Sequence, residues 1–157
     1  LMVLSRILVF QLLLVPALTF LSFTSSAVRN FYALHIDYPK VTFSKSFHGY
    51  CNGLMSYVRG MKKDWRCPQI HHVLHAPWTK VSSNCKHSDT FCEDFNEYCS
   101  LSQDAFPLTT CKRLSMEPPS TCQYNETTST KRVYLLCSRK YNGEPMYIIG
   151  IFQSGIE

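Results

Sequence analysis

Two hydrophobic periodicities divide the chain near residue 91. Before that point, apolar side chains recur with the period of an amphipathic helix. After it, short apolar runs are separated by turn residues, which predicts strands. Helices first and strands later indicate the α+β class of fold. The predicted helices cover 30–37, 49–61 and 78–85, and the predicted later strands cover 108–112, 132–137 and 146–152.

Two of these helices have an identifiable face. In the first, Phe31 and His35 are four residues apart and share one side. Residues 38–48, which follow it, are polar, aromatic and irregular, and we expect them to form a loop. The second helix takes its apolar stripe from Tyr50, Leu54, Tyr57 and Val58.

The stretch 67–75 contains three of the six histidines, at His71, His72 and His75. Its apolar and β-branched residues, with a proline near each edge, favour a strand. On a strand His71 and His75 face one way, ~13 Å apart at ~3.3 Å per residue, and His72 faces the other way. A helix would space His71 and His75 for metal chelation, but a strand does not. We therefore predict neither a metal site nor a cofactor.

The N-terminus has the pattern of a secretory signal peptide. Arg6 precedes an apolar run at 7–21, and small residues end the segment at Ala27. Gln11 and Pro16 interrupt the run, and it is shorter than the ~20 apolar residues of a transmembrane helix. We predict a signal peptide over 1–27, a single domain over 28–157, and a protein that is secreted without a transmembrane segment.

Composition agrees with an extracellular domain. Eight cysteines among 157 residues indicate an oxidising compartment and a disulfide framework, although spacing alone cannot choose the pairs. The formal net charge of +5 favours anionic partners without identifying one. A sequon at Asn125-Glu126-Thr127, in a segment expected to be a polar loop, predicts N-glycosylation of Asn125. Five acids fall in a stretch without Lys or Arg: Asp89, Glu93, Asp94, Glu97 and Asp104.

Several motifs together carry a family resemblance. They are the full ladder of cysteine spacings, Phe31-x-x-x-His35-x-Asp37, Tyr50-Cys51-Asn52, and Cys67 followed eight residues later by His75. Over about residues 30–150 the chain resembles the secreted pancreatic ribonuclease (ribonuclease A) family.

The resemblance implies a fold and a set of bridges. Three helices would pack on two antiparallel sheets in a kidney or V shape around a cleft. His75 would be a partly buried structural histidine. The three bridges that close long loops would each stabilise the fold by about 3–4.5 kcal/mol in the chain-entropy model. The implied disulfides are Cys51–Cys111, Cys67–Cys122, Cys85–Cys137 and Cys92–Cys99.

The same resemblance places the catalytic positions of the family. One histidine takes the proton of the ribose 2′-hydroxyl, a second protonates the leaving 5′-oxygen, and a lysine stabilises the charge on phosphorus. The first histidine corresponds to His35. The lysine corresponds to Pro68, and the second histidine corresponds to Met146 or, aligning on Pro145, to Tyr147.

Other positions near this site also depart from the family pattern. A glutamine before the first histidine is replaced by Leu34, an Asn-Thr pair by His71-His72, and a phosphate-binding lysine by Glu93. One lost proton-transfer group costs ~10²–10⁴ in rate, and one lost electrostatic donor costs ~10²–10³. We therefore expect no intact catalytic site, with His35 a vestige.

Three functional hypotheses follow. The first is an inactive, monomeric, secreted binding protein, with a role in the male reproductive tract implied by inactive relatives within the family. The second is weak or altered ribonuclease activity, or nucleic-acid binding, built on His35 and a substitute cation such as Lys62 or Lys63. The third is a cationic host-defence protein that binds anionic surfaces, for which the charge is small.

Overall fold

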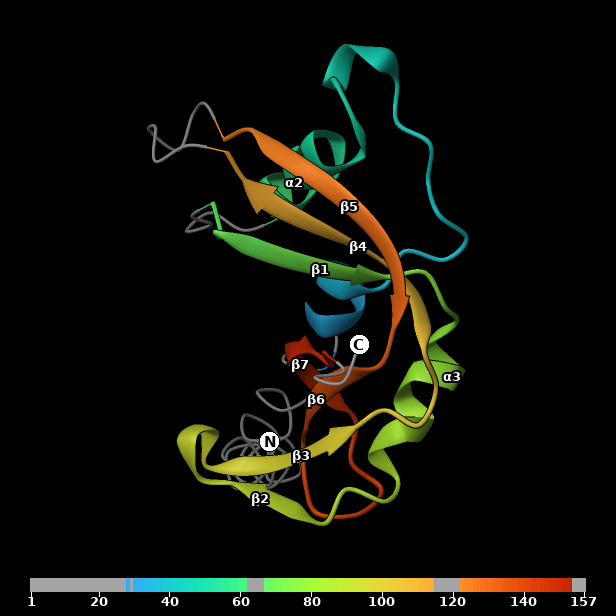
Figure 1. Cartoon of the computed structure of the whole chain (residues 1–157), viewed down its shortest axis with the longest axis vertical. Helices are drawn as coiled ribbons and strands as arrows, with labels where there is room; N and C mark the ends of the chain where they lie inside the picture. The colour runs from blue at the N-terminus through green and yellow to red at the C-terminus, as the bar shows by residue number, and fades with distance from the viewer. Residues whose placement is uncertain (1–27, 29, 62–66, 115–121, 154–157) are drawn as a thin grey trace, which may run out of the picture.

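Two antiparallel sheets form the framework of the protein (Figure 1). The computed structural model describes residues 28, 30–61, 67–114 and 122–153. One sheet has the strand order β1-β4-β5 and the other has the order β2-β3-β6-β7. The strands are β1 (Ile70–Leu74), β2 (Thr90–Cys92), β3 (Glu97–Leu101), β4 (Phe106–Arg113), β5 (Tyr124–Lys131), β6 (Val133–Cys137) and β7 (Pro145–Ile151).

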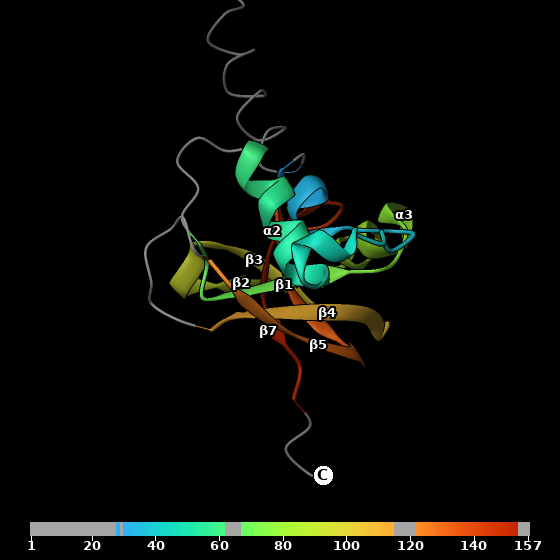
Figure 2. The same ribbon diagram turned by 90° about the horizontal axis from the view of Figure 1, so that it is seen from above.

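Three helices pack on these sheets. An N-terminal helix over 30–35 lies between the two sheets, α2 (Tyr50–Met61) covers one face of the first sheet, and α3 (Trp78–Ser82) lies at the side (Figures 1 and 2). The predicted α+β fold with three helices and two antiparallel sheets is confirmed. The described residues also form three short 3-10 turns: η1 (Lys45–Phe47), η2 (Ser83–Cys85) and η3 (Glu93–Phe95).

The core has two parts. The larger part joins the N-terminal helix and α3 to both sheets, with Phe31, Leu74, Phe106 and Leu135 almost fully buried. The smaller part lies between α2 and the first sheet, and Val58 and Val73 are at its centre. Because Val73 and Leu74 are adjacent on β1 and face opposite sides, this strand lies between the two parts of the core and contacts both.

The stripe predicted for the second helix is correct at three of its four positions. Tyr50, Leu54 and Val58 are buried, but Tyr57 is 63% exposed. The buried stripe runs through Cys51 as well, so its centre is rotated away from Tyr57. A period near 3.6 therefore located the helix, and packing on the sheet decided which side of the stripe is covered.

The segment predicted to be a polar loop around Asn125 is a strand instead. All eight residues of β5 pair with β4, from Arg113 opposite Tyr124 to Phe106 opposite Lys131. The loop prediction was wrong because β5 is an edge strand with polar side chains on both faces, so it lacks the apolar alternation that identifies strands. Its threonines favour the extended backbone, and Asn125 is exposed on it.

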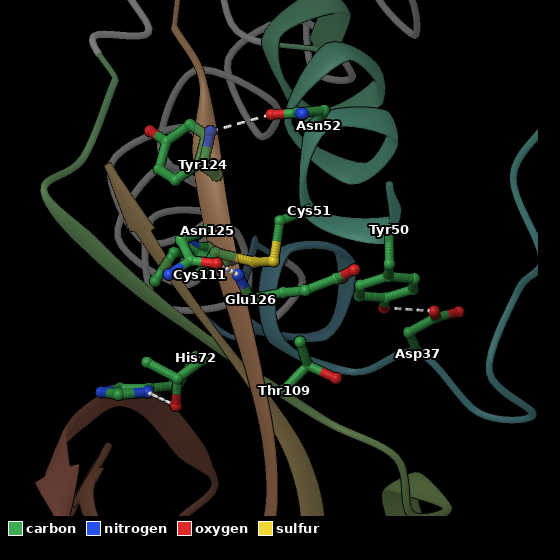
Figure 3. Close-up of a disulfide and its surroundings, with 12 residues drawn as sticks. Asp37, Tyr50, Cys51, Asn52, His72, Thr109, Cys111, Tyr124, Asn125 and Glu126 are labelled. Carbon is green, nitrogen blue, oxygen red and sulfur yellow. Dashed lines mark hydrogen bonds between the residues drawn. A yellow bond between two sulfur atoms is a disulfide. The ribbon is translucent and has the colours of Figure 1, made fainter. Parts of the chain in front are cut away.

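Four disulfides join these elements, and they are the pairs that the resemblance implied. Cys51–Cys111 connects α2 to β4 (Figure 3), and Cys85–Cys137 connects η2 to β6. Cys67–Cys122 joins the segments that lead into β1 and β5, and Cys92–Cys99 closes the β2–β3 hairpin. Beside the first bridge, the Asn52 side-chain oxygen accepts a hydrogen bond from the backbone N–H of Tyr124 at 2.9 Å (Figure 3). Helix α2 is therefore held to both β4 and β5.

Gly53 allows the loop at 38–48 to close on α2. A Cβ atom at Gly53 would lie 2.4 Å from the Phe43 ring, which packs against the smaller part of the core. We expect Gly53→Ala to lower the free energy of unfolding by about 1–2 kcal/mol, because overpacking outweighs the gain in helix propensity. Urea unfolding with the disulfides intact measures this change.

The matched control for this prediction is Gly150→Ala, because a Cβ atom there meets no atom within 4 Å. Its effect should be within about 0.5 kcal/mol. Combining Gly53→Ala with Phe43→Ala should remove the penalty, and an unchanged penalty in the double variant would contradict the proposed clash.

Candidate functional site

A cleft of about 560 Å³ lies at the junction of the two sheets. The N-terminal helix, β1 and β7 form its walls. Its described lining residues are Asn30, Phe31, Leu34, His35, Pro68, Ile70, His71, His72, Met146, Tyr147, Ile148 and Ile149. This set brings together His35 with all three positions that the resemblance associates with lost catalysis.

Histidine side chains fasten the N-terminal helix to β1. The His35 Nδ1–H donates to the carbonyl of His72 at 2.7 Å, and the His71 Nε2–H donates to the carbonyl of Leu34 at 2.7 Å. Just past the helix, the His75 Nδ1–H donates to the carbonyl of Asp37 at 2.8 Å. Because a carbonyl can accept but not donate, these bonds place a proton on each named nitrogen.

His75 has the structural role that the resemblance implied. Its second ring nitrogen lies 2.8 Å from the Thr109 hydroxyl, so both nitrogens are hydrogen-bonded within the fold. His72 turns to a different partner, the Thr110 hydroxyl, at 3.0 Å (Figure 3). Among the residues that the structure describes, no group of three or more His, Cys, Asp or Glu side chains is arranged to hold a metal ion.

His35 and His71 form a stacked pair that sequence reasoning missed. Their ring centroids are 4.6 Å apart with an interplanar angle of 18°, and they are 8% and 5% exposed. Burial lowers the pKa of His71 to about 4. The nearby His72 also lowers this pKa, and the hydrogen bond to the Leu34 carbonyl raises it. Burial also lowers the pKa of His72. The floor of the cleft therefore holds a neutral imidazole at His71 near neutral pH.

A sequence signal for this pair was present. His71 stands where the family has an asparagine. It directly precedes His72, whose carbonyl accepts the hydrogen bond from His35. Sequence reasoning treated His71-His72 only as a replacement of the family's Asn-Thr pair and His35 as a vestige. The structure instead places the two imidazoles face to face, which only the docking of the helix on β1 reveals.

A β-bulge decides which residue of β7 faces His35. Leu136 pairs with Tyr147 and Cys137 pairs with Pro145, so Met146 is the extra residue between them. The Tyr147 ring lies edge-on to His35 at 6.3 Å between centroids. Met146 also lines the cleft, but Tyr147 is the residue that the structure brings against the histidine.

The remaining predicted positions have different surroundings. Pro68 lines the cleft, and its carbonyl accepts a hydrogen bond from the Tyr124 hydroxyl at 2.7 Å. Glu93 is not among the lining residues of the cleft and lies on η3, between β2 and β3. The proposed substitute cations Lys62 and Lys63 lie outside the described residues.

Two sheets stapled by four disulfides around a cleft that contains His35 are the architecture expected of a ribonuclease-like protein. A family model described as pancreatic ribonuclease matches residues 26–149. The chain therefore belongs to the pancreatic ribonuclease family.

The relatives that this chain matches include proteins named as inactive and proteins named as pancreatic ribonucleases. The chain is 51% identical to the probable inactive ribonuclease-like protein 13 of Rattus norvegicus over 94% of this chain and 97% of the relative. It is 50% identical to the Homo sapiens protein of the same name, over 97% of each. The pancreatic ribonuclease of Iguana iguana is 34% identical over 72% of this chain and 87% of the relative.

A solved structure supports the fold. Green turtle egg white ribonuclease superposes with a TM-score of 0.59 at 23% identity, covering 82% of this chain and 98% of that one. Within the described residues, none of the helices has the length and apolar character needed to span a membrane.

The stacked histidines predict a pH-dependent stability. The pKa of His71 falls from 6.5 in the unfolded chain to about 4 in the folded one. As the pH falls below 6.5, the unfolded state therefore binds the proton before the folded state does. The contribution of His71 to the free energy of unfolding is fully present above pH 6.5 and is lost as the pH falls towards 4. The full loss is roughly 3 kcal/mol. Urea midpoints at about pH 7 and about pH 4 measure it.

His71→Gln is the matched variant, because glutamine does not titrate and its amide nitrogen lies as many bonds from the backbone as the His71 Nε2, so it can still donate to the Leu34 carbonyl. We expect its stability to depend less steeply on pH between about 4 and 6.5. Some dependence remains from His72, whose pKa shifts in the same direction. An identical pH dependence in the variant and the parent would contradict the buried neutral His71.

Proposed function

We propose that the protein is a secreted, catalytically inactive ribonuclease-like domain that acts by binding. One observation carries this proposal: none of the described residues that line the cleft is a lysine or an arginine. Pro68 and Tyr147 occupy the positions assigned to the catalytic lysine and the acid histidine. His35 remains, and the other two histidines of the described lining are hydrogen-bonded within the fold, His71 to the Leu34 carbonyl and His72 to the Thr110 hydroxyl.

The geometry explains the expected loss of activity. Cleavage within RNA moves a proton from the 2′-hydroxyl to a base while another proton reaches the leaving 5′-oxygen. The Tyr147 phenol lies near His35, but a phenol is a poor acid at neutral pH compared with an imidazolium. Charge also builds on the non-bridging phosphate oxygens, and Pro68 offers them neither a positive charge nor an N–H.

Relatives support the same conclusion. The rat and human proteins that match this chain over nearly their whole length are named probable inactive ribonuclease-like proteins. At about half identity they are far more similar to this chain than the iguana pancreatic ribonuclease is.

We also propose secretion after removal of residues 1–27, and action as a monomer. The inactive members of the family suggest the male reproductive tract as the site of this action. Weak binding of RNA or of an anionic surface is the second candidate role. Removal of residues 1–27 takes away Arg6 from the 16 Lys and Arg residues, and the remaining 15 against 11 Asp and Glu residues give a net charge of +4, which favours this role.

Restoring the two lost groups tests the proposal. We expect Pro68→Lys combined with Tyr147→His to raise cleavage of yeast RNA by ~10² or more over the parent, because a cation and an acid are both supplied. Adding His35→Ala to this variant should abolish the gain. Turnover by the parent protein that disappears with His35→Ala alone would overturn the proposal.

Processing of the expressed chain tests the secretion proposal. In mammalian cells we expect a secreted product that begins at Val28 and loses mass on treatment with a peptide N-glycosidase. Asn125 is exposed on an edge strand, so its amide is accessible. The Asn125→Gln product should show no such mass loss. A secreted product that retains residues 1–27 would contradict the predicted signal peptide.

A further inference from the structure

A second hollow lies on the sheet β2-β3-β6-β7, next to the cleft. Its volume is about 490 Å³, and Phe95, Tyr134, Glu93 and Asp94 contribute to its lining. Ile149 lines both this hollow and the cleft, so the two are contiguous. It is formed by the β2–β3 hairpin on one side and by β6 and β7 on the other.

The aromatic side chains of the hollow are open to solvent. Phe95 is 43% exposed and Tyr134 is 36% exposed. Tyr134 contacts the ring of Phe152, and that ring already has the Arg132 guanidinium over it at 5.5 Å. Within the described residues, no cation lies over the rings of Phe95 or Tyr134. The Phe152 ring therefore already has a guanidinium over it, whereas the rings of Phe95 and Tyr134 are open to an added cation.

Among its described lining residues, the hollow has two carboxylates and no lysine or arginine, and the Arg132 guanidinium lies over the neighbouring Phe152 ring. Glu93 and Asp94 are exposed at the rim, and the sequence has no Lys or Arg between Lys86 and Lys112. In the part of the chain that the structure describes, neither carboxylate forms an ion pair. Aromatic faces beside carboxylates attract a cation in two ways, through the ring quadrupole and through direct charge attraction.

The rim is also held in place before any partner arrives. Cys92–Cys99 closes the hairpin, and the Asn96 N–H donates to the Glu93 carbonyl at 3.1 Å. The backbone of such a turn needs little ordering when a ligand binds, which favours affinity.

We propose that this hollow is a docking site for an arginine-rich segment of a partner protein, which deepens the binding role proposed above. Arginine fits better than lysine because its planar guanidinium stacks on Phe95 or Tyr134 and pairs with a carboxylate in two-point fashion. At Glu93 the family carries a phosphate-binding lysine, so the charge on this side of the cleft is the inverse of that in an RNA-binding surface.

Fluorescence anisotropy with a labelled oligoarginine peptide tests the site on the full secreted protein. Glu93→Gln with Asp94→Asn should weaken binding by about tenfold, and Phe95→Ser by a few fold. The control is Glu126→Gln with Glu144→Gln, which changes the net charge equally on exposed positions outside the hollow. It should leave the affinity within about twofold of the parent.

Several outcomes would overturn the assignment. Equal weakening by the control pair would show attraction by net charge alone, and no effect of Phe95→Ser would remove the aromatic contribution. A labelled RNA oligonucleotide whose binding weakens in Glu93→Gln/Asp94→Asn would make RNA the occupant instead. Self-association lost in the same variant would make a second copy the occupant. None of these results depends on ribonuclease activity, so failure here is distinguishable from failure of the proposed inactivity.

Discussion

The contact on which the cleft depends is the docking of the helix at 30–35 on β1. Imidazole N–H groups of His35 and His71 donate to carbonyls across this junction, and His75 extends it past the helix. The Asp37 N–H adds a backbone hydrogen bond to Leu74 at 3.0 Å. Because the helix also places Phe31 in the larger part of the core, the same junction builds one wall of the cleft and closes the interior. A short helix held this way needs little stability of its own.

Architecture and chemistry are carried by different residues in this family fold, which is why one can persist without the other. Burial of Phe31, Leu74 and Leu135 and the four bridges stabilise the sheets whatever residue stands at Pro68 or Tyr147. The cleft is retained with a largely apolar lining that has no lysine or arginine among its described residues. Glu93 and Asp94 make the adjoining hollow acidic. The cleft and this hollow therefore both lack the positive charge of a groove that binds phosphate.

Sequence reasoning was most accurate where a regular period or a family motif was present. It located α2 and β1 and predicted the two-sheet fold, and it identified His35 and Pro68 as cleft positions. It failed at β5, because an edge strand with two polar faces has no apolar alternation.

By itself, the sequence determined the class of fold, the family, and the absence of a lysine and a C-terminal histidine at their expected positions. The tertiary structure decided which side chains meet. The bulge at Met146 places the Tyr147 ring edge-on to His35, and the register of β1 stacks the His71 ring on the same imidazole. Such contacts join residues more than 35 positions apart, and local periodicity contains no information about them. They arise when the helix at 30–35 packs on β1 and β7, which burial of the shared core drives.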